Sequence, residues 1–360
     1  MVKIVKYTVL FPFSLLYGFI SQIRNFIFDK GFAKSTKFDI PTICVGNLAV
    51  GGTGKTPHVE YLLTLLQNEC QTAMLSRGYK RKTKGFQLAD ENSNAAIIGD
   101  EPFQIQQKFP KATVAVAEKR VHGVEKLLEQ TPDLELVVLD DAFQHRSIQS
   151  GFSILLTDYS RLYTRDFYLP AGRLRESKRE SKRANIIVVT KCPNDISNSE
   201  MLAIQTEIKL QKGQTLFFST YKYDNLIPVF PDFERKATNE TLLKKDFGIL
   251  IVAGIVSPQP IVNYLHRYTT QIETLFFPDH HNFSKKDMEL LCKKFNSIDT
   301  KEKIIVVTEK DAARLLSMDY PDELKSKTFA LPVQVKILNN KEKLFTEKIK
   351  HYVRENSRNG

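Results

Sequence analysis

The feature that most constrains this chain is a glycine-rich segment between a short apolar run and an amphipathic stretch. The run is Thr42–Val45, the stretch carries Val59, Leu62 and Leu66, and the segment between them contains Gly51-Gly52-Thr53-Gly54-Lys55-Thr56. A strand followed by a glycine-rich loop and then a helix is typical of a phosphate-binding site, because glycines let backbone N–H groups converge on phosphate oxygens. The strict pattern has glycine where this chain has Ala49. A glycine-rich turn without a ligand is the alternative.

The residues around this loop indicate nucleotide chemistry. Lys55 is expected to bridge the β- and γ-phosphates, and the Thr56 hydroxyl is expected to join the coordination of Mg²⁺. An apolar run, Leu136–Leu139, ends in Asp140 and Asp141, which predicts metal-associated carboxylates. Paired aspartates at a strand end are otherwise often a helix N-cap.

Other nucleotide-binding classes match less well. Thr190-Lys191 has the first half of a guanine-reading motif and lacks the Asp that completes it, which disfavours GTP. Position 50 is Val, so the second lysine of a deviant Walker loop is missing. The chain contains no G-x-G-x-x-G segment, which leaves a dinucleotide oxidoreductase without support.

Short β-branched runs alternate with helix-length amphipathic segments along the whole chain. This alternation predicts an α/β fold, with a parallel sheet covered by helices on both faces. It pauses after Lys191, and a strand-like run at 216–223 then leads into the Pro-bearing segment 225–233. The domain boundary is expected there, and a second, smaller α/β set follows. The predicted organisation is an N-terminal helix (1–30), a nucleotide-binding core (31–220), a smaller α/β domain (221–350) and a polar tail (351–360).

Charge and cysteine usage narrow the class of partner and the compartment. With 52 basic and 41 acidic residues the net charge is +11, which favours a phosphate ligand, a nucleic acid or an anionic membrane face. Cys44, Cys70, Cys192 and Cys292 lack the spacing of a zinc or iron–sulfur site, which predicts a reducing cytoplasm and no structural metal. No nucleic-acid-binding module is recognised.

The N-terminus is apolar and basic. Residues 9–20 are too few to span a bilayer, and no signal-peptide cleavage site follows them. Leu16, Phe19, Ile20, Ile23 and Ile27 recur at the spacing of one helix face. Two interpretations remain open, a helix docked on the protein's own core and a helix lying in the headgroup region of an anionic membrane, and the two are compatible with each other.

Seven motifs together resemble one enzyme family, tetraacyldisaccharide 4'-kinase, the lipid A 4'-kinase, over about residues 10–315. They are Val45-Gly46-Asn47 with Gly51–Pro57, Leu75-Ser76-Arg77-Gly78-Tyr79, Gly99-Asp100-Glu101-Pro102, Leu139-Asp140-Asp141-Ala142-Phe143-Gln144-His145-Arg146, Leu169-Pro170-Ala171-Gly172-Arg173-Leu174-Arg175-Glu176, Phe277-Pro278-Asp279-His280 and Thr308-Glu309-Lys310-Asp311-Ala312.

The resemblance implies ATP- and Mg²⁺-dependent phosphorylation of the 4'-hydroxyl of a tetraacylated glucosamine disaccharide 1-phosphate. It also implies a P-loop kinase with two α/β/α domains joined by a β-ribbon hinge. The expected location is the cytoplasmic face of a bacterial inner membrane, without an obligate protein partner and without nucleic acid.

Carried over position by position, the resemblance assigns roles to named residues. Gly51, Gly52, Thr53, Gly54, Lys55 and Thr56 match the nucleotide loop, and Asp140, Asp141 and Glu176 match metal-associated acids. Asp100 and His280 match the catalytic dyad, which acts with Lys55. Because 180 residues separate Asp100 from His280, domain closure is expected to bring them together. Arg77, Tyr79, His145 and Arg175 fall on motifs of the disaccharide phosphate pocket. The basic residues at 80–84 exceed the family motif, and no role is assigned to them.

Two other functions remain as alternatives. A P-loop regulatory or chaperone ATPase would turn over ATP in response to a protein partner rather than an acylated disaccharide. A purely structural membrane-binding protein would leave the phosphate loop without a ligand.

Overall fold

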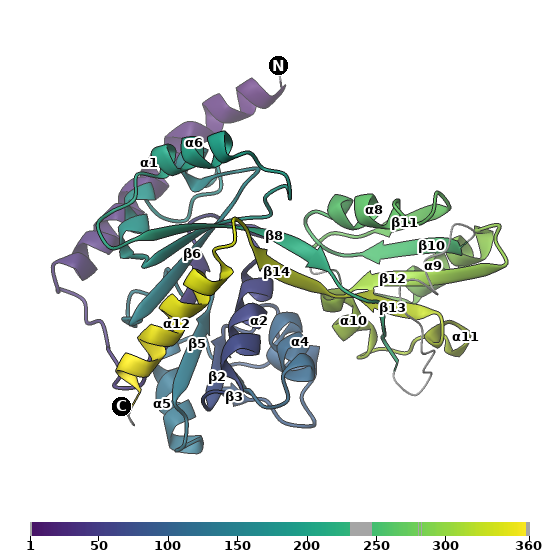
Figure 1. Ribbon diagram of the computed structural model, residues 1–360, viewed down its shortest axis with the longest axis horizontal. Helices are drawn as coiled ribbons and strands as arrows, with labels where there is room; N and C mark the ends of the chain where they lie inside the picture. The colour runs from purple at the N-terminus through teal and green to yellow at the C-terminus, as the bar shows by residue number, and fades with distance from the viewer. Residues whose placement is uncertain (1, 231–246, 280, 282, 358–360) are drawn as a thin grey trace. The chain divides into compact units, whose positions relative to one another are not determined.

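The computed structural model describes residues 2–230, 247–279, 281 and 283–357. The chain divides into two compact units (Figure 1). The first comprises Met1–Asn92, Ile105–Tyr221 and Val335–Gly360, and the second comprises Ser93–Gln104 and Lys222–Gln334. The chain therefore passes between the units four times. Two crossings lie on either side of segment 93–104, and the other two lie within neighbouring strands of one sheet, β8 (Thr215–Tyr223) and β14 (Val333–Ile337).

The first unit is built on a nine-stranded sheet in the order β14-β8-β7-β6-β1-β5-β2-β4-β3. Strands β1, β2 and β4–β8 pair in parallel, and β3 runs antiparallel to β4. The carboxyl ends of the parallel strands therefore share one edge, where ligands bind in sheets of this kind. The remaining strands are β1 (Thr42–Asn47), β2 (Thr72–Ser76), β3 (Gln87–Leu88), β4 (Thr113–Val116), β5 (Leu136–Asp140), β6 (Phe152–Asp158) and β7 (Ile186–Thr190).

Both faces of this sheet are covered by helices. Side chains alternate across a strand, so Ile43 and Val45 of β1 enter one core while Cys44 enters the other. The first core includes α2 (Lys55–Leu66) and α12 (Glu342–Asn356), and the second includes α5 (Arg120–Gln130) and α6 (Asn198–Ile208). Near-continuous burial of strands such as β5 and β7 follows from this double cover.

The C-terminus differs from the predicted polar tail at 351–360. Helix α12 continues to Asn356, and its Phe345, Ile349 and Val353 are buried in the core of the first unit. Tyr352 also hydrogen-bonds the start of β1, with its hydroxyl 3.1 Å from the N and 3.2 Å from the O of Thr42. The segment is polar on one face only, and the apolar residues at every fourth position were the signal for a helix.

The second unit has a five-stranded sheet in the order β11-β10-β12-β13-β9, parallel except for β9 against β13. The strands are β9 (Ile227–Pro228), β10 (Phe247–Ala253), β11 (Ile272–Phe276), β12 (Glu302–Thr308) and β13 (Thr328–Leu331). The helices are α3 (Ala95–Ile98), the start of α4 (Asp100–Lys108), α8 (Gln259–Leu265), α9 (Lys285–Ser297), α10 (Glu309–Leu315) and α11 (Asp322–Lys325). Residues 93–104 join this unit because Asp100 pairs with Arg314 and Glu101 pairs with Lys310.

Helix α1 (Val2–Asp29) turns its small and polar side toward the first unit. Ser14, Gly18, Ser21 and Asn25 are buried, and Ser14 Oγ accepts a hydrogen bond from Ala171 N at 2.9 Å. The apolar side is exposed, with 58% of Leu16, 62% of Phe19 and 59% of Ile20 accessible. The helix thus docks on the rest of the first unit, as one of the two interpretations expected, but it does so through its small and polar side and not through the apolar face. No helix within the described residues combines the length and apolarity needed to cross a membrane.

Candidate active site

The phosphate loop connects the end of β1 to the first turn of α2. Gly51 and Gly54 have φ of 116° and 87°, a region that side chains rarely adopt. Gly54 is the N-cap of α2, and a Cβ there would lie 2.3 Å from the Tyr221 hydroxyl. Asn47 Nδ2 donates to Thr53 Oγ1 at 2.7 Å inside the loop. The predicted nucleotide residues thus form one strand–loop–helix turn, as the glycine spacing indicated.

Asp140 ends β5 and Asp141 follows it, beside this loop, since β5 is a parallel neighbour of β1. Ser76, at the end of β2, donates to Asp140 Oδ2 at 3.1 Å. Asp141 lies 3.8 Å from Lys55 Nζ and 2.8 Å from Arg175 Nη2. Burial raises the pKa of Asp141, but the charges of Lys55 and Arg175 outweigh burial and hold the pKa below its usual range. Asp141 is therefore a carboxylate, as a ligand for a cation would need to be.

Arg175 connects the second aspartate to the phosphate loop. Its Nη2 hydrogen-bonds Asn47 Oδ1 as well as Asp141. The segment carrying it lies along the loop, with Val50 N bonded to Arg173 O and Arg175 N bonded to Leu48 O, both at 2.8 Å. Arg175 therefore orients Asp141 and Asn47, and its expected place in the disaccharide phosphate pocket stays a prediction.

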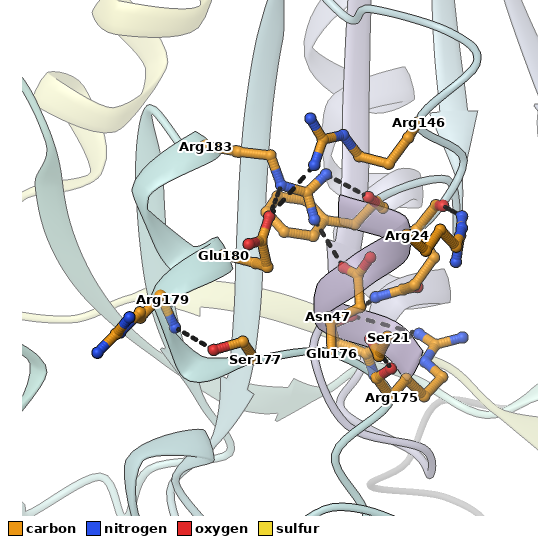
Figure 2. A network of polar contacts seen from close by, with 12 residues as sticks. Ser21, Arg24, Asn47, Arg146, Arg175, Glu176, Ser177, Arg179, Glu180 and Arg183 are labelled. Carbon is orange, nitrogen blue, oxygen red and sulfur yellow. Dashed lines mark hydrogen bonds and ion pairs between the residues drawn. The ribbon is translucent and has the colours of Figure 1, made fainter. Parts of the chain in front are cut away.

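Glu176 lies in a neighbouring ion-pair network (Figure 2). The residue is fully buried, and its Oε2 lies 2.6 Å from Arg183 Nη2. Arg183 also donates to Phe143 O at 2.7 Å and lies 2.9 Å from Glu180, so it joins the 175–180 segment to the loop after Asp141. Glu176 thus has a guanidinium partner, and its expected role as a metal-associated acid stays a prediction.

His145 lies close enough to Arg120 and Arg77 for their charges to affect it, and Arg120 contacts Asp140. Arg120 is fully buried, and its Nη2 donates to Asp140 O at 3.1 Å. Burial lowers the pKa of Arg120 to about 10, opposed by the charges of Asp140 and Asp141. Burial and the charges of Arg120 and Arg77 lower the pKa of His145 to about 4, so its imidazole is neutral near pH 7. Arg77 and Tyr79 are exposed, Tyr79 with 59% of its surface accessible.

Asp100 is the first residue of α4 and lies in the second unit. Arg314 of α10 donates to Asp100 Oδ2 from Nε at 2.8 Å and from Nη2 at 2.7 Å. The predicted partner, His280, lies outside the described residues. Its neighbour Asp279 shares Lys310 with Glu101, at 3.4 and 3.0 Å.

These contacts change the expectation that domain closure brings the dyad together. The segments carrying Asp100 and Asp279 belong to the same unit, and Lys310 contacts the neighbour of each predicted dyad residue. The segments that carry Asp100 and Asp279 are brought together by folding of the second unit, because residues 93–104 belong to it. Movement between the units is therefore not needed to bring these two segments together.

Sequence reasoning missed three arginines that hold site residues in place: Arg120, Arg183 and Arg314. Arg314 lies two residues beyond a quoted motif, and Arg120 begins a helix directly after a strand, which were weak signals. Arg183 lies in a run of charged residues, 178–183, that is typical of a solvated turn. Only the structure shows that the guanidinium of Arg183 contacts both Glu176 and the carbonyl of Phe143.

His58, one turn into α2, gives this unit a pH dependence. It is buried, with Nδ1 2.8 Å from Gly54 O and Nε2 3.1 Å from Ser219 Oγ. Burial lowers the pKa of His58 to about 4, although the hydrogen bond to Gly54 opposes the shift. Between pH 6.5 and 4 the unfolded chain therefore binds a proton that the native state does not, and native stability falls as the pH falls through this window.

We expect His58→Gln to flatten this dependence. Since one pKa unit corresponds to ~1.4 kcal/mol, His58 accounts for up to about 3 kcal/mol of the stability lost between pH 6.5 and 4. Thermal unfolding of the variant and the wild type at several pH values measures the difference. His122→Gln is the control, because His122 is half exposed. Equal pH slopes for wild type and His58→Gln would contradict the assignment.

The donor set matches a magnesium ion that relies on a nucleotide for its other ligands. Within the described parts of the chain, no three His, Cys, Asp or Glu side chains are arranged to hold a metal. Mg²⁺ typically uses one or two carboxylates together with substrate phosphates. Asp140 and Asp141 beside the phosphate loop supply that number.

Comparisons with known proteins agree with this geometry. A family model described as tetraacyldisaccharide-1-P 4'-kinase matches residues 6–354. The chain is 48% identical to the tetraacyldisaccharide 4'-kinase of Bacteroides thetaiotaomicron, over 99% of this chain and 96% of that protein. It is 47% identical to the enzyme of the same name from Flavobacterium johnsoniae, with 97% of each chain covered.

A solved structure is also similar. It is the "apo" form of LpxK from Aquifex aeolicus in complex with ATP, with a TM-score of 0.73 and 30% identity, covering 96% of this chain and 99% of that one. The α/β fold predicted from the strand–helix alternation is confirmed by this match. By sequence over nearly its whole length and by fold, the chain belongs to the tetraacyldisaccharide-1-phosphate 4'-kinase family.

Proposed function

We propose that ATP is the phosphoryl donor of this chain and that its terminal phosphate passes to the 4'-hydroxyl of an acylated glucosamine disaccharide 1-phosphate. By family the chain is a tetraacyldisaccharide 4'-kinase, an enzyme of lipid A biosynthesis. The observation that carries the proposal is the glycine loop between β1 and α2, with Lys55 and Asp141 beside it.

The donor side of the reaction uses the first unit. Loop N–H groups and Lys55 contact the phosphates, and charge neutralisation by such fixed groups supplies most of the acceleration in phosphoryl transfer. Thr56, Asp140 and Asp141 would hold Mg²⁺, which when bound neutralises charge on the phosphate oxygens. Arg175 keeps Asp141 ionised and oriented, so that it faces a cation as a carboxylate.

The acceptor side uses Asp100 as the general base. Its carboxylate accepts the proton of the acceptor hydroxyl as that oxygen attacks the terminal phosphorus, and ADP leaves. Arg314 fixes the carboxylate through two N–H donors, which limits its rotation. We propose that His280 hydrogen-bonds Asp100. We also propose that the disaccharide phosphate is contacted by Arg77, Tyr79, His145 and Arg175.

Transfer of label tests this function directly. The purified protein is incubated with γ-labelled ATP, Mg²⁺ and disaccharide 1-phosphate lipid in detergent, and the lipid fraction is counted. Label in the lipid is the expected result. ATP hydrolysis that is independent of the lipid and stimulated by a protein would instead favour the regulatory ATPase.

We also propose that α1 docks the enzyme on an anionic membrane surface, at the cytoplasmic face of the inner membrane. Exposed Phe13, Leu16, Phe19 and Ile20 give this helix an apolar side, and contiguous exposed apolar surface marks interaction sites. A substrate with four acyl chains is itself held in a bilayer, so docking shortens the search for it.

A double substitution on this face tests the docking. Leu16→Glu with Phe19→Glu is expected to lower vesicle binding at least ~10²-fold, because two large apolar side chains lose their burial in lipid. Co-sedimentation with phosphatidylglycerol-containing vesicles measures it. Leu202→Glu with Leu344→Glu is the matched control, since both leucines are exposed elsewhere on the first unit. Unchanged sedimentation of the folded α1 variant would contradict the proposal.

A further inference from the structure

The carbonyl groups of three consecutive residues in the phosphate loop each have a hydrogen-bond partner in a side chain outside the loop. Gly52 O accepts a hydrogen bond from Lys191 Nζ, and Thr53 O accepts one from Thr190 Oγ1 at 2.9 Å. Gly54 O lies 2.8 Å from His58 Nδ1. Two of these three partners are adjacent residues at the carboxyl end of β7, far from the loop in sequence.

The orientation of these carbonyls matters for phosphate binding. The N–H and C=O of a peptide point in opposite directions, so a loop whose N–H groups converge on an anion has to turn its carbonyls away from it. A carbonyl that turned inward would place a negative dipole end against phosphate. A fixed donor outside the loop holds the carbonyl in the outward orientation.

Lys191 is itself held tightly at this point. Its φ of 58° lies in the left-handed region, which is uncommon for a lysine. Asp158, at the end of β6, lies 2.8 Å from Lys191 Nζ. Thr190 is fully buried and also contacts Thr157 O at 3.3 Å. Both donors are therefore fixed by β6 and β7 rather than by the loop.

We propose that Thr190 and Lys191 are positioning residues for the phosphate loop, holding the carbonyls of Gly52 and Thr53 outward so that the loop N–H groups face the nucleotide. The proposal rests on the nucleotide site proposed above. It gives a role to Thr190-Lys191, which matches only half of a guanine-reading motif. Lys191 is also a second lysine at the phosphate loop, supplied by the end of a strand that is distant in sequence.

Nucleotide affinity tests this role. Lys191→Met removes the donor with little change of shape, and Thr190→Val removes the hydroxyl isosterically. Binding of fluorescent N-methylanthraniloyl ATP and ADP is measured together with thermal unfolding and steady-state kinetics. The control is Lys209→Met, because Lys209 is exposed and also has a left-handed φ, 53°, but ends α6.

We expect Lys191→Met to weaken ATP and ADP by the same factor, ~10–100-fold, and Thr190→Val to weaken both by ~3–10-fold. The KM for ATP should rise in parallel, while kcat at saturating ATP and the KM for the lipid stay within ~3-fold of wild type. Because ADP lacks the γ-phosphate, a residue that contacted the γ-phosphate directly would affect ATP alone. Weakening of both nucleotides by the same factor therefore indicates an effect on the loop. Lys209→Met should match the wild type.

Three results would overturn the inference. Folded Lys191→Met and Thr190→Val proteins with wild-type affinities would show that the loop needs no such support. Weakened ATP with unchanged ADP would place Lys191 directly on the γ-phosphate. A loss of kcat with unchanged affinity would place the dipeptide in the chemical step. If the wild type bound neither nucleotide, the proposed function would fail first, and this inference with it.

Discussion

Asp100→Asn is expected to lower kcat ~10²–10⁴-fold while leaving the affinity for ATP close to that of the wild type. Asparagine keeps the size of the side chain but cannot accept the hydroxyl proton, and the stated range is typical for the loss of a general base. The phosphate loop lies in the other unit, so its hydrogen bonds do not depend on this carboxylate. Steady-state kinetics with both substrates varied, together with nucleotide binding, separates the two effects.

The control for Asp100→Asn is the same chemical change at an exposed site of the same unit. Asp322 is 83% exposed at the start of α11, and Asp322→Asn should leave kcat unchanged. Unfolding temperatures of both variants identify any loss caused by the Arg314 contact alone. Near-normal turnover of a folded Asp100→Asn protein would remove Asp100 from the role of base.

Lys55→Met is expected to lower kcat by ~10²–10³-fold and also to weaken ATP binding. The ammonium group contacts the phosphates at the point where negative charge redistributes, and the loss of one such donor has this size in other enzymes. Lys55 is also one of the charges that lower the pKa of Asp141. Arg175 remains 2.8 Å from Asp141 in this variant, so the carboxylate stays ionised, and the need for Mg²⁺ should not rise.

A magnesium titration of the residual activity at fixed ATP checks that the site for the cation is intact in Lys55→Met. The matched control is Lys212→Met, at an exposed position between α6 and β8. We expect the control to show the wild-type magnesium dependence. Undiminished ATP-dependent activity in Lys55→Met would contradict the assignment of the loop.

Local chemistry was predictable wherever a few neighbouring residues determine it. The turn at Gly51–Thr56 requires two positive φ angles and a strand before it, and all of this is visible in one continuous segment. Asp140 was likewise visible, because a polar residue ends a fully apolar run. The alternation of strands and helices was strong enough to give the α/β class.

Contacts between distant segments were not predictable in this way. Arg314 and Asp100 are 214 residues apart, and no periodicity in either segment indicates that they pair. The assignment of residues 93–104 to the second unit follows from that pairing, so the predicted range 31–220 could not anticipate it.

The orientation of α1 was open for a different reason. Its spacing identified an apolar face but not which side would meet the protein. Ser14, Ser21 and Gly18 face the first unit because small residues allow close approach: a Cβ at Gly18 would lie 2.6 Å from the Tyr168 ring. Small polar residues at helical spacing, rather than the apolar ones, were the sign of the docked side.

The return of β14 and α12 to the first unit has a consequence for biosynthesis of the chain. A ribosome releases the N-terminal end first, so the entire second unit emerges before the sheet of the first receives its last strand and helix. Until then β8 lacks its outer neighbour, and Phe217 lacks the Phe345 ring that packs 5.0 Å from it. A nascent polypeptide that stops short of α12 presents an open strand edge and bare apolar surface, the features that lead to aggregation. We therefore expect a premature stop codon before β14 to destabilise the nucleotide-binding unit, although its glycine loop has long been translated.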